Sequence, residues 1–175
     1  FLAKHSLYRV SPVQVLGRCL LVVQMITLSG LASANDSITK LALAVAQGRF
    51  EESAPKLQEI FESSSDLTEK TNAALLLASA PAGSVVYPGR AIYAQFVLKN
   101  SDPKSISTAD RARLLRTEAM GFFASARWAQ ARAAFEELLI VGAGNELALA
   151  ELQLGWIDMN EAHPELAATR WVRLL

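Results

Sequence analysis

Few side chains of this 175-residue sequence could carry catalytic or metal-binding chemistry. There is one cysteine, Cys19, and there are two histidines, His5 and His163. Cys19 and His5 lie in an N-terminal stretch with the pattern of a cleavable signal, whose removal would leave no thiol and a single imidazole. A zinc site or a cysteine–histidine nucleophile needs several such groups, so we predict neither. His163 precedes Pro164 and suits a helix start or an exposed loop.

The carboxylates offer no convincing catalytic pair. Glu51 and Glu52 are adjacent, as are Glu136 and Glu137, and adjacent helix residues point about 100° apart. Such pairs suit a solvated helix face better than acid–base work. The sequence contains no nucleophile elbow, phosphate-binding loop, dinucleotide fingerprint, zinc-protease motif or calcium loop. We therefore predict a protein that is not an enzyme and has no cofactor or metal. A helical lytic or hydrolytic enzyme is the third and least favoured interpretation.

The charges are unevenly placed along the chain. Residues 1–34 hold three of the 17 basic side chains, Lys4, Arg9 and Arg18, and no acid. The other 14 basic side chains stand against 17 acidic ones, which gives the remainder a net charge of −3. A mildly acidic body does not favour nucleic-acid binding, and we predict none.

Residues 1–34 have the pattern of a secretory signal peptide. Basic residues precede the apolar run 19–31, which is short for a membrane span. Ala32 and Ala34 then place small residues where a signal peptidase requires them. We expect the mature protein to begin at Asn35 and to be periplasmic or secreted, with no membrane span. The alternative is an uncleaved helix that anchors the protein in the inner membrane.

The most informative stretch of the remaining sequence predicts a helix hairpin. Trp128, Ala131, Phe135 and Leu138 are spaced so that they share one helix face. The small Ala131 between large side chains lets a neighbouring helix come close. We expect a tight turn just before Trp128, Ala131 at the contact between the helices, and Arg132 on the solvated face.

Similar patterns predict helices over the rest of the domain, residues 35–175. We expect a helix capped by Asp36 or Ser37, then helices over 51–62, 109–125 and 146–161 and one that opens at Pro164. Pro55 is expected to delay the start of the second of these, and Asn145 to cap the helix over 146–161.

The least regular part lies between residues 66 and 108. Thr71 is expected to cap a short helical run over 73–79. Pro88 is expected to open a helix that reaches Lys99. The predicted buried face of that helix consists of Ile92, Phe96 and Val97.

Three segments resemble tetratricopeptide repeats (TPR). Phe50, Trp128 and Pro164 mark the same turn in three units, and a degenerate unit fits around residue 88. The first unit matches the family's order of glycine, aromatic, small, large and small residues. The matching residues are Gly48, Phe50, Ser53, Leu57 and Ile60; Ala167, Trp171 and Leu174 in turn repeat the spacing of Ala131, Phe135 and Leu138.

The resemblance implies an all-α fold, an α-solenoid of about four stacked antiparallel hairpins. Sel1-like or other helix-hairpin repeats are the alternative. Glu118, Glu151 and Asp158 stand where the tetratricopeptide family usually keeps apolar side chains. The last helix stops with an apolar face unfinished, so we expect the natural chain to continue beyond Leu175 and the present one to self-associate.

The resemblance also implies a binding surface, because the first helix of each repeat lines the concave side in that family. Core packing is the alternative for the apolar members, Trp156 above all, and solvated helix surface is the alternative for the arginines. The candidate residues are Arg113, Arg116, Met120, Phe123, Leu149, Leu152, Trp156 and Asn160.

These expectations point to an exported scaffold that holds a protein or peptide partner in a concave helical groove. Arg113 and Arg116 would suit an acidic or C-terminal peptide, and Trp156 would serve as an apolar anchor. The alternative is a structural assembly subunit of a bacterial cell-envelope complex.

Overall fold

A computed structural model describes residues 36–175, which form eight α-helices, one short 3-10 helix and no strand in that range. The fold class is therefore all-α, as predicted. The predicted signal peptide, residues 1–34, lies outside the described residues. The helices are α2 (Asp36–Ala46), α3 (Phe50–Ser63), α4 (Leu67–Ala78), η1 (Tyr87–Gly89), α5 (Arg90–Asn100), α6 (Thr108–Ala124), α7 (Trp128–Val141), α8 (Asn145–Asn160) and α9 (Pro164–Val172).

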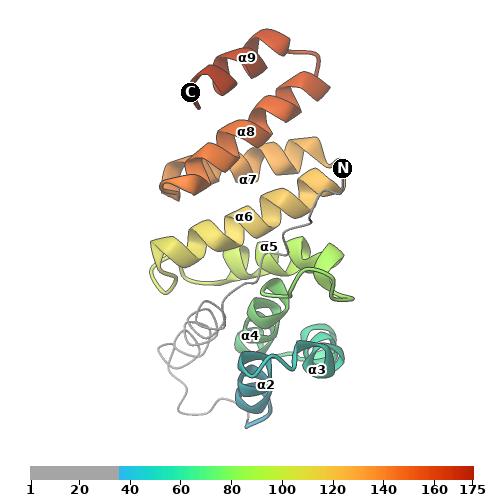
Figure 1. Ribbon diagram of the computed structural model, residues 1–175. Helices are drawn as coiled ribbons and strands as arrows, with labels where there is room; N and C mark the ends of the chain where they lie inside the picture. Colours follow the sequence, from blue (N-terminus) through green and yellow to red (C-terminus); the bar gives the residue numbers. More distant parts are fainter. Residues whose placement is uncertain (1–35) are drawn as a thin grey trace, which may run out of the picture.

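The helices are stacked in chain order. Each α-helix from α2 to α9 contacts the next one along the chain, and α2 also contacts α4. Figure 1 shows the result as a pile with α2 and α3 at one end and α9 at the other. Within residues 36–175, no helix has the length and hydropathy needed to cross a bilayer.

The same turn joins three of the helix pairs. Gly48, Ala126 and Ala162 have positive φ angles of 81°, 55° and 63°, and each lies two residues before the next helix begins. The following residue donates its N–H to the carbonyl five residues back, at 2.8–2.9 Å in all three turns. This is the Schellman arrangement that ends helices. The alignment of the turns before Phe50, Trp128 and Pro164 is thus confirmed at the level of the backbone.

The core consists of three successive clusters along the stack. The first joins α2, α3 and α4 around Leu57 and Leu76, and a middle one joins α4, α5 and α6 around Val97. The largest joins α6, α7 and α8 around Phe135 and Leu154. Ala131 is fully buried in that cluster, as expected for the contact point of the Trp128 hairpin.

Two expectations about helix starts are wrong, although the predicted helix over 51–62 is confirmed as α3. Helix α3 begins at Phe50 although Pro55 lies inside it; the carbonyl that Pro55 leaves without its helical donor belongs to the exposed Glu51, where water can reach it. Helix α4 begins at Leu67, because Asp66 accepts a hydrogen bond from the Thr68 N–H and caps it, whereas Thr71 lies inside the helix. Asn145 is the first residue of α8 and makes no capping hydrogen bond.

The predicted buried face of α5 is also partly wrong. Ile92 is 55% exposed, and the buried residues are Ala91, Ala94 and Val97. A β-carbon at Gly121 of α6 would overlap the Ala91 side chain, so the two helices approach closely through small residues. That close approach turns Ile92 outward. Leu174, which repeats the sequence spacing of Leu138, is exposed.

Candidate partner-binding surface

The eight candidate residues lie on α6 and α8, one helix apart in the stack. Arg113 and Arg116 are exposed on α6, whereas Met120 and Phe123 are half-buried. On α8, Leu149 is half-buried, and Leu152, Trp156 and Asn160 are exposed. We call the exposed and half-buried sides of α6 and α8 that carry these eight residues the α6–α8 face.

An ion pair joins the two helices of this face. Arg116 Nη1 lies 3.6 Å from Glu146 Oε1, at the first turn of α8. Arg113 instead pairs with Asp110 on its own helix, at 3.3 Å. Both arginine side chains remain about half exposed, at 51% and 47%. Exposed pairs of this kind contribute little stability, so both guanidinium groups can still bind a partner.

A third arginine of α6 has a structural role. Arg111 is mostly buried and pairs with Glu137 of α7, so it ties the hairpin together. A further guanidinium lies near Arg116: burial lowers the pKa of Arg90, the nearby Tyr87 acts in the opposite sense, and the positive charge of Arg116 lowers the pKa further. The guanidinium groups of Arg90 and Arg116 therefore lie close enough to repel each other.

Phe123 contributes to the core as well as to the face. Its ring makes edge-on contacts with Trp128 and Phe135, with centroids 5.3 and 6.3 Å apart. Met120 also packs against the α6–α8 cluster. Met120 and Phe123 therefore connect the α6–α8 face to the core.

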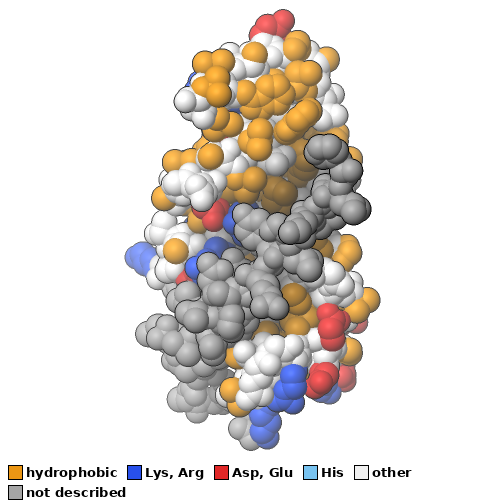
Figure 2. Space-filling view, in the orientation of Figure 1, with side chains coloured by type: hydrophobic (Ala, Val, Ile, Leu, Met, Phe, Trp, Pro, Cys, Tyr) orange, Lys and Arg blue, Asp and Glu red, His pale blue; other side chains and the backbone are white. Residues whose placement is uncertain are grey.

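Trp156 lies at the surface. Its side chain is 48% exposed, and its ring meets that of Trp171 edge-on at 5.3 Å. Trp171 Nε1 donates to the Leu152 carbonyl at 3.2 Å, and a β-carbon at Gly155 would overlap the Trp171 indole. The absence of a side chain at Gly155 thus lets α9 seat Trp171 beside Trp156. Figure 2 shows hydrophobic side chains gathered at this α8–α9 end of the molecule.

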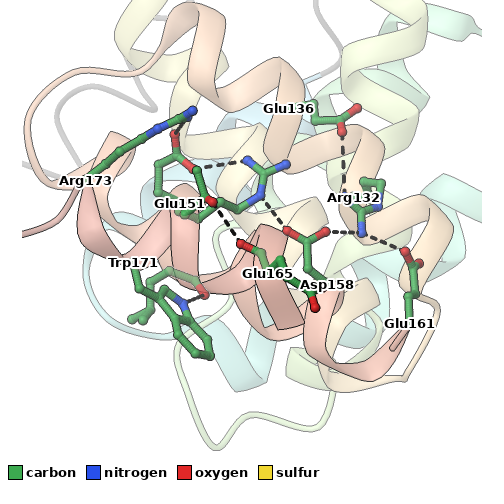
Figure 3. Close-up of polar contacts among 11 residues, drawn as sticks. Arg132, Glu136, Glu151, Asp158, Glu161, Glu165, Trp171 and Arg173 are labelled. Atoms are coloured by element: carbon green, nitrogen blue, oxygen red, sulfur yellow. Dashed lines mark hydrogen bonds and ion pairs between the residues drawn. The ribbon is translucent and has the colours of Figure 1, made fainter. Parts of the chain in front are cut away.

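A network of ion pairs around a buried aspartate was missed by sequence reasoning. Asp158 is fully buried; Arg132 Nη2 donates to its Oδ1 at 2.6 Å and Arg170 Nε to its Oδ2 at 2.7 Å. Arg132 also contacts Glu161 at 2.7 Å, and Arg170 contacts Glu151 at 3.1 Å. Figure 3 shows how these side chains converge from α7, α8 and α9. We call them the Asp158 network.

The Asp158 network corrects the placement of Arg132, which was expected on the solvated face. The sequence did offer a signal for a buried charge, because Asp158 directly follows the apolar positions Leu154 and Ile157. Its partners, however, lie 26 and 12 residues away. Helical periodicity shows which residues share a face of one helix, but it cannot show which residues pair between three different helices.

The electrostatics of the network favour a structural role. Burial by itself raises the pKa of Asp158, but hydrogen bonds from Arg132 and Arg170 and their positive charges outweigh it and hold the pKa below its ordinary value. A carboxylate with both oxygens occupied and a lowered pKa is a poor proton donor or acceptor near neutral pH. The network stabilises the packing of α7, α8 and α9.

The pKa of Glu118 is raised above its ordinary value. Burial is the main cause; a hydrogen bond of 2.8 Å from Gln95 Nε2 opposes it, and the nearby negative charge of Glu137 adds to it. Gln95 belongs to α5 and Glu137 to α7. Glu118 is thus half-buried at the contact between α5 and α6.

The structure also contains an open cleft of about 290 Å³ between α4, α5, α6 and the loop that precedes α6. Its lining includes polar side chains such as Thr71, Asn72 and Asn100 and apolar ones such as Leu75 and Val97. None of the eight candidate residues lines it. Over residues 36–175, no cluster of three histidine, cysteine or acidic side chains could hold a metal ion.

Comparison with known proteins gives no relative for this chain: no protein-family model, no curated protein and no solved structure matches it.

Proposed function

We propose that this chain is an exported, TPR-like α-solenoid that binds a protein or peptide partner on the α6–α8 face. The repeated Schellman turn supports the hairpin repeat, because an equivalent helix end recurs before Phe50, Trp128 and Pro164. Packing of each helix on the next along the chain supports the same architecture.

The exposed Trp156 carries this proposal. A surface indole flanked by Leu152 and Met159, which are 40% and 43% exposed, leaves apolar area in water. Aromatic side chains of this kind are the usual anchors of protein interfaces. Arg113 and Arg116 at the other helix of the face add a positive rim, which suits acidic groups on the partner.

The test is a comparison of Trp156→Ala with Ile140→Ala. Ile140 is 82% exposed on α7 and lies outside the α6–α8 face, so it controls for the loss of an exposed apolar side chain. Immobilised Trp156→Ala should lose partners that the parent chain captures from envelope extracts of the source cells, whereas Ile140→Ala should keep them. The double variant Arg113→Ala/Arg116→Ala should weaken capture at an unchanged melting temperature. If Trp156→Ala keeps every partner, the proposed binding face is wrong.

Export is the second part of the proposal and rests on the pattern of residues 1–34. The intact mass of the protein recovered from its producing cells should correspond to a chain that begins at Asn35. Full-length protein recovered from the inner membrane would instead favour an uncleaved anchor.

The alternative function, a structural subunit of an envelope assembly, has one observation of its own. The outer side of α9 exposes Leu166 and Val172, at 54% and 68%. If this end packs against another subunit, Val172→Asp should abolish concentration-dependent association in sedimentation, and Trp156→Ala should not. If the purified chain sediments as a monomer at all concentrations, association through this end is excluded.

A further inference from the structure

The cleft between α4, α5, α6 and the loop that precedes α6 combines polar and apolar side chains. We call it the α4–α5 cleft. Of its twelve described lining residues, seven carry a hydroxyl, amide or carboxylate group and five are aliphatic. Two of the aliphatic ones, Val97 and Leu114, belong to the buried core. A ligand in this cleft therefore meets both hydrogen-bonding groups and apolar side chains.

Two carboxamides line the cleft, one from each helix of the α4–α5 hairpin. Asn72 lies in the middle of α4, and Asn100 is the last residue of α5. Both are half-buried, so they remain accessible from the open cleft. Asn100 Nδ2 donates to the Phe96 carbonyl at 2.8 Å, which leaves its Oδ1 available as an acceptor. The Asn72 amide makes no hydrogen bond within residues 36–175.

The packing of α4 does not explain Asn72. The residues that follow it, 73–78, are alanine and leucine, and all but Leu75 are buried. Asparagine is less favourable than either in the interior of a helix, because its side chain competes for backbone hydrogen bonds. Asn72 has no partner in the described chain that would offset this cost. A residue that contradicts a local preference without structural compensation indicates a functional site.

We propose that the α4–α5 cleft binds one neutral sugar residue, whose hydroxyl groups bond to Asn72 and Asn100. The C–H groups of the sugar ring pack on Leu75 and Val97. Sugar hydroxyls both donate and accept hydrogen bonds, as carboxamides do. None of the eight candidate residues of the α6–α8 face lines the cleft, so this inference does not rest on the proposed function.

The size of the cleft suits a single ring. Its volume of about 290 Å³ equals that of about ten liquid water molecules. This volume lies at the lower end of the range of small-molecule sites. A single sugar ring therefore fits better than a larger ligand.

The lining argues against charged, aromatic and wholly apolar ligands. No described lining residue is a lysine, arginine or histidine, so a phosphate or carboxylate would find no cation. One acid is present, Asp102, which is exposed and accepts a hydrogen bond from the Lys104 N–H at 2.9 Å; a cation would gain little from it. The same residues include no aromatic ring on which a flat ligand could stack. A wholly apolar ligand would remove water from the polar side chains without replacing it.

The test is a titration of the isotope-labelled full chain, followed by the chemical shifts of its backbone amides, which show where a ligand binds. The neutral probes are the methyl glycosides of glucose, galactose, mannose and N-acetylglucosamine. The matched charged probes are the methyl glycosides of glucuronic, galacturonic and mannuronic acid, which add a carboxylate to the same rings.

At least one neutral probe should shift the amides of residues 67–75 and 97–106, which contribute to the cleft. The uronic acid probes should bind about tenfold or more weakly than the best neutral probe. Their carboxylate would be repelled by Asp102 and would lose water without gaining a cation.

Asn72→Leu should weaken binding of the best neutral probe by about tenfold or more, since it removes the hydrogen bonds of the amide. The melting temperature should stay the same or rise, because leucine is the better helix former. Thr71→Val should also weaken binding, because the Thr71 hydroxyl donates to the Leu67 carbonyl at 2.7 Å and can still accept from a ligand. Thr169→Val is the matched control: Thr169 donates in the same way to the Glu165 carbonyl, at 2.8 Å, but lies outside the cleft, so binding should be unchanged.

The proposal is overturned if no neutral probe shifts the cleft amides, or if a uronic acid probe binds as tightly as the neutral ones. A lower melting temperature of Asn72→Leu with unchanged binding would show that Asn72 is structural. Shifts confined to Trp156 and Trp171 would place the sugar at the exposed indoles instead. If no sugar binds and Asn72→Leu loses protein partners that the parent chain captures, the cleft holds a side chain of that partner.

Discussion

At the scale of single residues, Asp158 and Arg132 show how a charged pair can replace apolar packing. Asp158 is fully buried, as are Leu154 and Ile157 on the same helix. Its two arginine partners come from the helices on either side of α8. Removing one partner of a buried pair costs more than the pair contributes, because the remaining charge stays buried.

Arg132→Ala should therefore destabilise the protein by about 3 kcal/mol, measured by urea unfolding. Arg113→Ala is the matched control, because Arg113 is exposed and pairs only within its own helix; its effect should stay within about 0.5 kcal/mol. Equal unfolding midpoints for the two variants would contradict the assignment of Arg132 to a buried network.

The lowered pKa of Asp158 predicts a specific acid response. A carboxyl group whose folded pKa lies below its unfolded value stabilises the fold above the unfolded pKa, which is about 3.9 for aspartate. That contribution is lost as the pH falls through the folded pKa. Asp158→Asn should thus be less stable than the parent chain at neutral pH, and the difference should shrink below about pH 4. A difference that stays constant down to pH 2 would show that ionisation of Asp158 contributes nothing.

At the scale of elements, the recurring Schellman turn explains which helices the sequence predicted well. The starts at Trp128 and Pro164 depend on local signals, namely a turn residue and the apolar spacing that follows it. The start of α4 depends on the Asp66 cap, and the outward turn of Ile92 depends on the close contact between Gly121 and Ala91. That contact joins two helices, so the spacing within α5 alone could not reveal it.

The exposure of the candidate surface was predictable to a similar extent. The resemblance to tetratricopeptide repeats implied that Arg113, Arg116, Leu152 and Trp156 lie on an accessible side, and all four are exposed. It could not show that Glu146 and Gln153 carry unpaired buried oxygens, because pairing depends on groups from other helices.

The turn before Trp128 gives a prediction at this scale. Ala126 adopts a left-handed conformation that costs a non-glycine residue about 1 kcal/mol or more, so Ala126→Gly should stabilise the protein by about 0.5–1 kcal/mol. Ala129→Gly, in the exposed first turn of α7, should instead destabilise it by about 1 kcal/mol. Thermal unfolding of both variants checks the pair. If both substitutions change the stability in the same direction, relief of backbone strain at Ala126 is contradicted.

At the scale of the whole molecule, packing runs from each helix to the next, and the core is divided into three clusters. In such a stack, stability is set by neighbouring contacts rather than by one central core. The α6–α8 face belongs to the largest cluster, so its two helices have a rigid support. A rigid face reduces the ordering cost of binding a partner.

The Asp158 network determines which helices of the stack unfold together. A terminal helix held only by its neighbour would fray first, and its amide protons would exchange with solvent earliest. Arg170 of α9 and Arg132 of α7 both donate hydrogen bonds to Asp158 of α8. The last three helices should therefore unfold locally as one cooperative unit. Amide protons of α9 should then exchange with deuterium at a rate close to those of α8. Arg170→Ala should release α9 alone to rapid exchange, whereas Arg173→Ala, which removes only an exposed contact with Glu151, should not.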